Sequence, residues 1–283
     1  MVRAARVSLL SVLILCPVAA ALVTSPSAAI EPTPQARVIG VAASGSSSSY
    51  WMARPDGEVL AFGNAGQFGS LQSAGITPTA PIVGIVATPD AKGYWLVAAD
   101  GGIFAFGDAG FYGSTGNIHL NQPVVGMAAT PDGGGYWLVA ADGGIFAFGD
   151  AGFYGSTGSI HLNQPVVGMA ATADGGGYWL VAADGGIFAF GDAGFLGSMG
   201  GTPLNKPIVA MAPDAATGGY WEVASDGGIF SFGAPFYGST GGDVLNAPIV
   251  GMASTPHGGG YWLAAQDGGL FNFGDAQFSG SGA

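Results

Sequence analysis

An all-β fold built from six repeated units is predicted by three features of the sequence. First, a Tyr-Trp pair recurs six times, and consecutive tryptophans of these pairs are 41 to 44 residues apart. Second, an Asp-Gly pair follows each Tyr-Trp pair within a few residues and marks a tight turn after a short apolar run. Third, 53 of the 283 residues are glycine and only 8% are charged, as expected for many short strands joined by turns. The tryptophans are Trp51, Trp95, Trp137, Trp179, Trp221 and Trp262.

Each unit contains four short segments that are expected to be strands. In the third unit they are PVVGMAAT (123–130), GYWLVAA (135–141), GIFAFG (144–149) and FYGS (153–156). The pair Asp142-Gly143 predicts a two-residue hairpin turn with positive φ at both residues. Apolar side chains occupy both faces of these segments, which indicates that the sheets are covered on both sides.

The repeats predict a β-propeller. Three features are typical of blades stacked around an axis: short strands, sheets that are apolar on both faces, and a turn at a fixed place in each unit. We call this turn the glycine corner; in the third unit it is GDAG (149–152). Six units fill residues 38–283, so we expect six blades of four short antiparallel strands. The first and last blades are expected to meet by side-chain packing, without exchanging a strand. Helix is expected to be nearly absent after the leader, because Gly, Pro and turn signals interrupt every candidate segment.

The start of the chain has the features of a secretory signal. Arg3 and Arg6 precede an apolar run at 7–15, and small residues that suit a cleavage site follow. The run is too short to span a bilayer, so the mature protein is expected to be secreted or associated with the cell surface, without membrane insertion. The chain is therefore divided into a signal peptide (1–29), a linker (30–37) and a six-repeat domain (38–283).

Charge and cysteine content exclude several classes of partner and of stabilisation. The formal net charge is −12, and no basic patch exists that could neutralise phosphates, so nucleic acid and anionic membrane surfaces are poor partners. The only cysteine, Cys16, lies in the leader, so packing alone is expected to hold the mature protein together. A monomer is expected.

The repeat resembles those of two known families. The segments DGEVLAFGNAGQFGS (56–70) and DGGIFAFGDAGFYGS (100–114) are similar to repeats of the regulator-of-chromosome-condensation propellers. The whole unit more closely resembles a Gly-rich repeat of exported actinobacterial proteins, which is often attached to cell-wall hydrolases or proteases. This chain has shorter units than the eukaryotic family, lacks its Gly-Gln-Leu-Gly run and has six units rather than seven. The resemblance implies a propeller, and these departures argue against a nucleotide-exchange or chromatin role.

Three aromatic positions recur in the units, and we assign them different environments. The tryptophans are interpreted as large side chains that fill the space between blades, with sugar stacking as the alternative. After the glycine corner, one position holds Gln67 in the first unit and phenylalanine in the others, and it is expected in the core: Phe111, Phe153, Phe195, Phe236 and Phe278. The next position varies from Tyr112 and Tyr154 to Leu196 and Ser279, so it is expected to reach solvent.

Exposed tyrosines on the rim and the loops between blades supply the candidate binding residues. The loops NIHLNQP (117–123) and SIHLNQP (159–165) place the same polar residues beside two successive blades. The candidates for a glycan or protein contact are Tyr112, Tyr154, His119, His161, Asn121 and Asn163.

Neither a metal nor a cofactor is expected. His119 and His161 lie a blade apart and lack a neighbouring third ligand, unlike the groups that hold zinc. The corner aspartates supply one carboxylate each, too few for calcium, and are interpreted as turn-forming residues. These are Asp108, Asp150, Asp192 and Asp275.

The sequence predicts a non-catalytic protein. It contains no Gly-x-Ser-x-Gly, His-Glu-x-x-His or phosphate-loop motif. The second and third units, 82–123 and 124–165, are nearly identical, whereas a catalytic acid and base need different environments. A propeller glycoside hydrolase or lyase is the less favoured alternative, and it would draw on residues that occur in one unit only. Such residues include Arg54, Glu58, Glu222, Asp243 and His257.

We therefore expect an exported binding module that recognises a cell-wall or other extracellular glycan through several equivalent weak sites. Linked weak sites gain avidity without new contacts. The alternative is a protein-interaction or structural surface module. Aromatic faces open to solvent favour the glycan, whereas a continuous apolar patch favours a protein partner.

Overall fold

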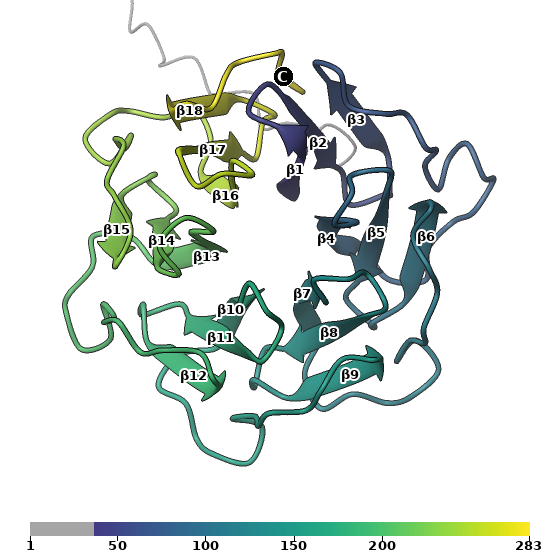
Figure 1. Cartoon of the computed structure of the whole chain (residues 1–283), viewed down its shortest axis with the longest axis horizontal. Helices are drawn as coiled ribbons and strands as arrows, with labels where there is room; N and C mark the ends of the chain where they lie inside the picture. The colour runs from purple at the N-terminus through teal and green to yellow at the C-terminus, as the bar shows by residue number, and fades with distance from the viewer. Residues whose placement is uncertain (1–36) are drawn as a thin grey trace, which may run out of the picture. The chain divides into compact units, whose positions relative to one another are not determined.

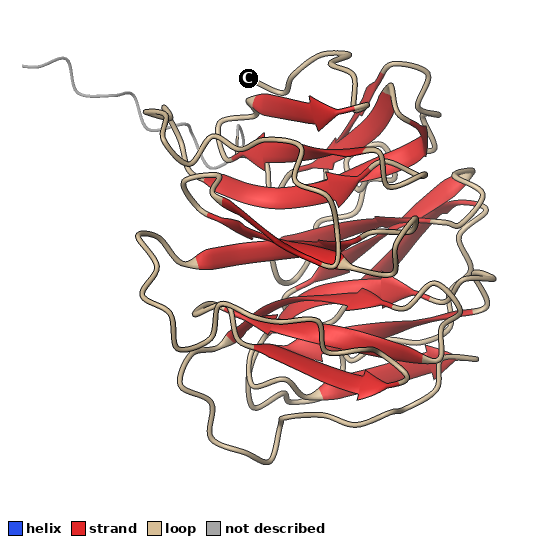
Figure 2. Cartoon of the chain, turned by 60° about the vertical axis from the view of Figure 1, so that its left-hand side comes forward, coloured by secondary structure: helices blue, strands red, loops and turns tan. Residues whose placement is uncertain are grey.

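Six antiparallel sheets of three strands follow one another along residues 37–283, the part of the chain that the computed structural model describes (Figure 1). No helix occurs in this part (Figure 2). The first strands of the sheets are β1 (Gly40–Ser46), β4 (Ile82–Ala87), β7 (Val124–Ala129), β10 (Val166–Ala171), β13 (Ile208–Pro213) and β16 (Ile249–Ser254). The second strands are β2 (Ser49–Ala53), β5 (Gly93–Ala98), β8 (Gly135–Ala140), β11 (Gly177–Ala182), β14 (Tyr220–Ala224) and β17 (Gly260–Ala265). The third strands are β3 (Val59–Phe62), β6 (Ile103–Gly107), β9 (Ile145–Gly149), β12 (Ile187–Gly191), β15 (Ile229–Phe232) and β18 (Leu270–Gly274).

The six sheets are neighbours in sequence order, and the last is also a neighbour of the first. Strands β4, β7, β10, β13 and β16 contact one another in succession, and β1 contacts both β16 and β4. Figure 1 shows these first strands nearest the centre and the third strands outermost. The prediction of an all-β fold with six repeated antiparallel sheets is confirmed, and the arrangement is consistent with a six-bladed propeller.

The second strands carry the core because both of their faces are apolar. Trp137 of β8 lies opposite Ala128 of β7 and Ala147 of β9, and these small neighbours leave room for the indole. Its ring packs against Tyr178 of the next sheet, with 5.8 Å between ring centroids. Its Nε1 donates a hydrogen bond of 2.6 Å to the Gly152 carbonyl. All six tryptophans are at most 3% exposed, so they join neighbouring sheets and present no open face to a sugar.

The Asp-Gly turns lie where the sequence predicts them, but their type differs. Gly143 has φ of +75°, whereas Asp142 has no positive φ. The Gly143 N–H bonds to the Ala140 carbonyl, and the Gly144 N–H bonds to Asp142 Oδ1 at 2.9 Å. The aspartate side chain thus stabilises a longer turn in which only the glycine needs the left-handed region. A two-residue turn with two positive φ values was the wrong prediction.

The predicted fourth strand is not a strand among the described residues. The segment 153–156 has no ladder partner, and instead it reaches the next sheet. There the Tyr178 hydroxyl accepts a hydrogen bond from the Tyr154 N–H and donates one of 2.6 Å to the Gly155 carbonyl. Gly155 has φ of +138°, which a strand of L-residues does not adopt. A tyrosine hydroxyl therefore replaces the strand ladder, and each sheet has three strands.

The last unit reaches the first sheet through the same contact. The Tyr50 hydroxyl accepts a hydrogen bond of 3.0 Å from the Ser279 N–H and donates one of 2.6 Å to the Gly280 carbonyl. The Gln277 N–H also bonds to the Ser47 carbonyl at 2.7 Å. No strand is exchanged between these units, but hydrogen bonds to the backbone join them in addition to the expected side-chain packing.

The predicted signal peptide (1–29) and all but the last residue of the predicted linker (30–37) lie outside the described residues. Within residues 37–283, no helix is long and apolar enough to cross a membrane.

Candidate functional site

The phenylalanines that follow the glycine corners are exposed, whereas the sequence pattern predicts them in the core. Their exposed fractions lie between 57% and 63% for Phe111, Phe153, Phe195, Phe236 and Phe278. In an extended segment, successive side chains point to opposite sides, so the following residue faces the next sheet and the phenylalanine faces outward. Gln67, the equivalent residue of the first unit, is also exposed, and its polarity was the signal that could have corrected the prediction.

Tyr112 and Tyr154 are partly exposed contacts between sheets. The Tyr112 ring packs against Tyr136, with 5.6 Å between centroids, and its hydroxyl donates a 2.7 Å hydrogen bond to the Gly133 carbonyl. Tyr154 repeats this arrangement with the Gly175 carbonyl at 2.9 Å. Each residue is 38% exposed, so part of each side chain remains open to solvent and the rest joins two sheets.

Replacing Tyr112 by alanine is therefore expected to lower the free energy of unfolding by roughly 1–3 kcal/mol, through lost packing and a lost hydrogen bond. Urea denaturation of the full chain measures the change. Phe111→Ala is the matched control, because it removes an adjacent aromatic ring that is 63% exposed, and it is expected to change stability by at most about 0.5 kcal/mol. A larger loss for Phe111→Ala than for Tyr112→Ala would contradict the assigned environments.

The loop between the second and third units forms one wall of a groove of about 260 Å³, which we call the third-sheet groove. His119, Asn121 and Gln122 line it on the loop side. The opposite side is the third sheet, which contributes Asp142 from the Asp-Gly turn and Phe146 from β9. The structure thus brings together two of the predicted binding residues, His119 and Asn121.

The same groove occurs again two sheets later, and we call this copy the fifth-sheet groove. It has a volume of about 280 Å³. Asn205, Lys206, Asp226 and Phe230 occupy the positions of Asn121, Gln122, Asp142 and Phe146. The exposed Phe236 also lines this copy. Recurrence at equivalent positions indicates that the groove is a property of the repeat. In the unit between them, His161 and Asn163 take the same loop positions, and both are exposed.

The predicted tyrosines and loop residues do not form one site. Tyr112 bonds to Gly133, just before β8 begins, whereas the third-sheet groove contains Asp142, just after β8 ends. A strand of this length spans roughly 20 Å. Tyr112 and Tyr154 therefore lie at one end of the sheets, and His119 and Asn121 lie at the other.

The third-sheet groove is lined by groups that can form hydrogen bonds with a ligand. Asp142 Oδ1 accepts the Gly144 N–H, and Oδ2 has no hydrogen-bond partner among residues 37–283, so it can accept a bond from a hydroxyl. The Asn121 amide both donates and accepts. Phe146 adds an apolar face.

The corner aspartate Asp192 and the turn aspartate Asp174 lie beside the same threonine hydroxyl. Thr172 Oγ1 lies 2.9 Å from Asp174 and 3.2 Å from Asp192, so its single proton can be donated to one of these carboxylates at a time. The backbone N–H of Gly176 lowers the pKa of Asp174, with the Thr172 hydroxyl as the second cause. In the second sheet, Lys92 lowers the pKa of Asp90 to about 2. Residues 37–283 contain no group of three or more His, Cys, Asp or Glu side chains that could hold a metal ion.

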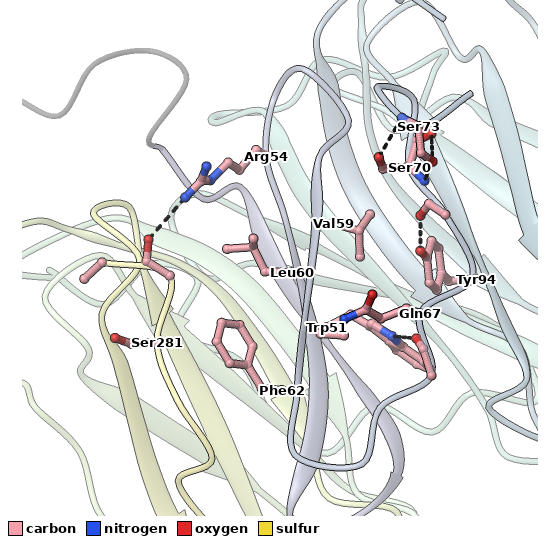
Figure 3. Close-up of a pocket in the computed structure, with 15 residues that line it drawn as sticks. Trp51, Arg54, Val59, Leu60, Phe62, Gln67, Ser70, Ser73, Tyr94 and Ser281 are labelled. Atoms are coloured by element: carbon pink, nitrogen blue, oxygen red, sulfur yellow. Dashed lines mark hydrogen bonds between the residues drawn. The ribbon is translucent and has the colours of Figure 1, made fainter. Parts of the chain in front are cut away.

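A pocket of about 500 Å³ lies where the last unit meets the first sheet (Figure 3). Arg54 forms an ion pair with Glu58 at 2.5 Å, and it also donates a hydrogen bond of 3.3 Å to the Gly282 carbonyl. The Trp51 indole at this pocket is 0% exposed and bonds to the Gly66 carbonyl at 2.7 Å. The bond from Arg54 to the Gly282 carbonyl joins the first and last units, whereas the other two contacts lie within the first unit.

Comparison with known proteins supports the fold. No family model matches the chain, and no curated protein matches it. The chain is similar to the crystal structure of a structural genomics protein of unknown function from Bacteroides thetaiotaomicron, with a TM-score of 0.55 and 12% sequence identity. The match covers 84% of this chain and 69% of that chain. At this identity, the likeness concerns the fold alone.

Proposed function

We propose that the protein is an exported six-bladed β-propeller that binds an extracellular glycan, such as a cell-wall polysaccharide, through several equivalent sites and without catalysis. The observation that carries this proposal is the set of five equivalent phenylalanines with exposed fractions of 57–63%: Phe111, Phe153, Phe195, Phe236 and Phe278. Burying an aromatic ring is favourable, so five exposed copies are a cost to the monomer that a ligand can offset.

The repeated grooves support the same proposal. Each described copy places an aspartate, an asparagine and a phenylalanine at equivalent positions, and Phe236 lines one of them directly. Sugars offer hydroxyls to the polar groups and an apolar face to the ring. Equivalent sites on one rigid scaffold would bind a polymer with avidity, because the second contact becomes intramolecular.

The test is the affinity for ligands of increasing length. Peptidoglycan, chitin and soluble N-acetylglucosamine oligomers of two and six sugars are suitable probes. We expect the six-sugar oligomer to bind at least tenfold more tightly than the two-sugar oligomer. Replacing the five phenylalanines by alanine is expected to remove this difference, since each lost stacking contact costs roughly 1 kcal/mol.

Val244→Ala is the control for this experiment. Val244 is fully exposed, with a relative accessibility of 101%, but it does not follow a glycine corner. Its removal should leave both affinities unchanged. Equal affinity for short and long oligomers, or full binding by the five-fold variant, argues against a multivalent glycan site.

A protein partner is the second candidate, and exposed aliphatic residues favour it. Ile118 and Ile160 are 57% and 56% exposed in the loops between units, and Ile118 lines the third-sheet groove. A protein surface would bury such side chains, whereas sugars seldom need them. Loss of binding to a protease-sensitive cell-surface fraction in Ile118→Ser plus Ile160→Ser, without competition by sugars, would support this candidate.

A further inference from the structure

Glu222 is a buried acid at a position that is apolar in every other unit. It lies in the middle of β14, where the equivalent residues are Met52, Leu96, Leu138, Leu180 and Leu263. The side chain is 0% exposed. Neither of its carboxyl oxygens has a hydrogen-bond partner among residues 37–283.

The surroundings of Glu222 are apolar on its own sheet. Its cross-strand neighbours are Met211 on β13 and Phe230 on β15. The equivalent Leu138 of the third sheet packs in a cluster with Trp95 and Val97 of the preceding sheet. Glu222 therefore occupies the contact between the fourth and fifth sheets, where a charge loses its hydration.

The charged groups near Glu222 also oppose its ionisation. Asp184, in the Asp-Gly turn of the fourth sheet, is the charged residue that acts on it, and its charge has the same sign. Tyr220 of β14 is the other titratable neighbour, and it is neutral at neutral pH. The ion pairs within residues 37–283 join Arg54 to Glu58 and Lys92 to Asp90, so neither supplies Glu222 with a cation.

The Asp-Gly turn of the fourth sheet lies beside the Glu222 carboxyl group. In three other units a threonine hydroxyl bonds to the carbonyl of the turn aspartate, as Thr157 does to Asp142 at 3.0 Å. In the fourth unit Met199 replaces the threonine. Glu222 Oε2 approaches this same turn, 2.8 Å from the point where a Cβ on Gly185 would lie. The Glu222 carboxyl group therefore lies beside a turn that lacks the threonine hydroxyl of the other units.

We propose that Glu222 is a neutral carboxylic acid in the folded protein at neutral pH, and that its ionisation in alkaline solution weakens the contact between the fourth and fifth sheets. Burial is the main cause that raises the pKa of Glu222, to about 8, and Asp184 adds to it. The ordinary value of 4.5 applies to the unfolded chain.

The sign of the pH effect follows from these two values. Below pH 4.5 both states hold the proton, and stability does not depend on this group. Between pH 4.5 and about 8 the unfolded chain loses its proton and the folded chain keeps it, so stability falls as pH rises. Above about pH 8 both states are ionised and the dependence ends. The lowered pKa values of Asp90 and Asp174 act at lower pH and with the opposite sign.

Carbon-13 labelling of glutamate carboxyls tests the protonation state directly. The full chain contains three glutamates, Glu31, Glu58 and Glu222, so three signals are expected. One signal should titrate near pH 8 and be absent from Glu222→Gln. If all three signals titrate at or below pH 5, the proposal is wrong. This measurement on the wild type stands even where a variant fails to fold.

Urea denaturation between pH 5 and 9 tests the consequence. The unfolding constant of the wild type is expected to rise up to about a thousandfold more than that of Glu222→Gln over this range. Glu58→Gln is the matched control, because it makes the same chemical change in a partly exposed ion pair, and the pH dependence of its unfolding constant should run parallel to that of the wild type. Parallel profiles for the wild type and Glu222→Gln would overturn the proposal.

Discussion

Trp137→Ala is expected to lower the free energy of unfolding by roughly 3–5 kcal/mol, the usual cost of truncating a buried aromatic residue. The indole is 0% exposed, and it joins the third sheet to Tyr178 of the fourth. Its removal leaves a cavity between two sheets and also deprives the Gly152 carbonyl of its donor. Urea denaturation followed by circular dichroism measures the loss.

Phe153→Ala provides the comparison for Trp137→Ala within the same unit. Phe153 is 63% exposed, so its truncation is expected to change stability by at most about 0.5 kcal/mol. If the two substitutions cost the same, the assignment of tryptophan to the scaffold and phenylalanine to the surface is wrong.

Gly149→Ala is expected to cost roughly 3–5 kcal/mol, although it adds only one methyl group. Gly149 has φ of +70°, which disfavours any residue with a Cβ. The added Cβ would also overlap the Gly134 carbonyl oxygen and lie 2.8 Å from Gly135 Cα. Both obstacles are backbone atoms, so the chain must move for the methyl group to fit. Urea denaturation measures the cost.

Two other glycines separate the causes of this effect. Gly218 has φ of +73° but no atom within 4 Å of the place that an added methyl group would take, so Gly218→Ala should show the conformational cost alone, about 1–2 kcal/mol. Gly194 has open space and no positive φ, so Gly194→Ala should be nearly neutral. If Gly149→Ala lowers the free energy of unfolding no more than Gly218→Ala does, the close approach of backbone atoms at Gly149 contributes nothing to the loss of stability.

The repeat period and the three main strands of each unit could be predicted because local signals agree with one another. In the third unit, the expected segments 123–130, 135–141 and 144–149 contain β7, β8 and β9. Each is an apolar run bounded by turn residues, and the following Asp-Gly pair fixes one end. The position of the turn was predictable, whereas its type depends on the side-chain bond of Asp142, which propensity does not reveal.

The fourth segment and the candidate site could not be predicted because they depend on contacts between units. The segment 153–156 has strand-like residues. Its backbone N–H and carbonyl groups, however, form hydrogen bonds with the hydroxyl of Tyr178 in the next unit instead of with a neighbouring strand. The same contact turns Tyr154 toward the next sheet and Phe153 toward solvent. His119 and Asn121 are near Tyr112 in sequence, but the intervening chain carries them to the opposite end of the sheets.

The closing contact between Tyr50 and residues 279–280 has a consequence for biosynthesis. The ribosome produces the chain from its N-terminus, so β2 and β3 emerge long before their covering segment, which is more than two hundred residues downstream. Until the ribosome has made residues 262–280, Tyr50 lacks Trp262 and the Gly280 carbonyl, which it contacts in the folded protein. The nascent first sheet therefore exposes aromatic side chains throughout elongation, and it is the part of the molecule that a chaperone would be expected to hold.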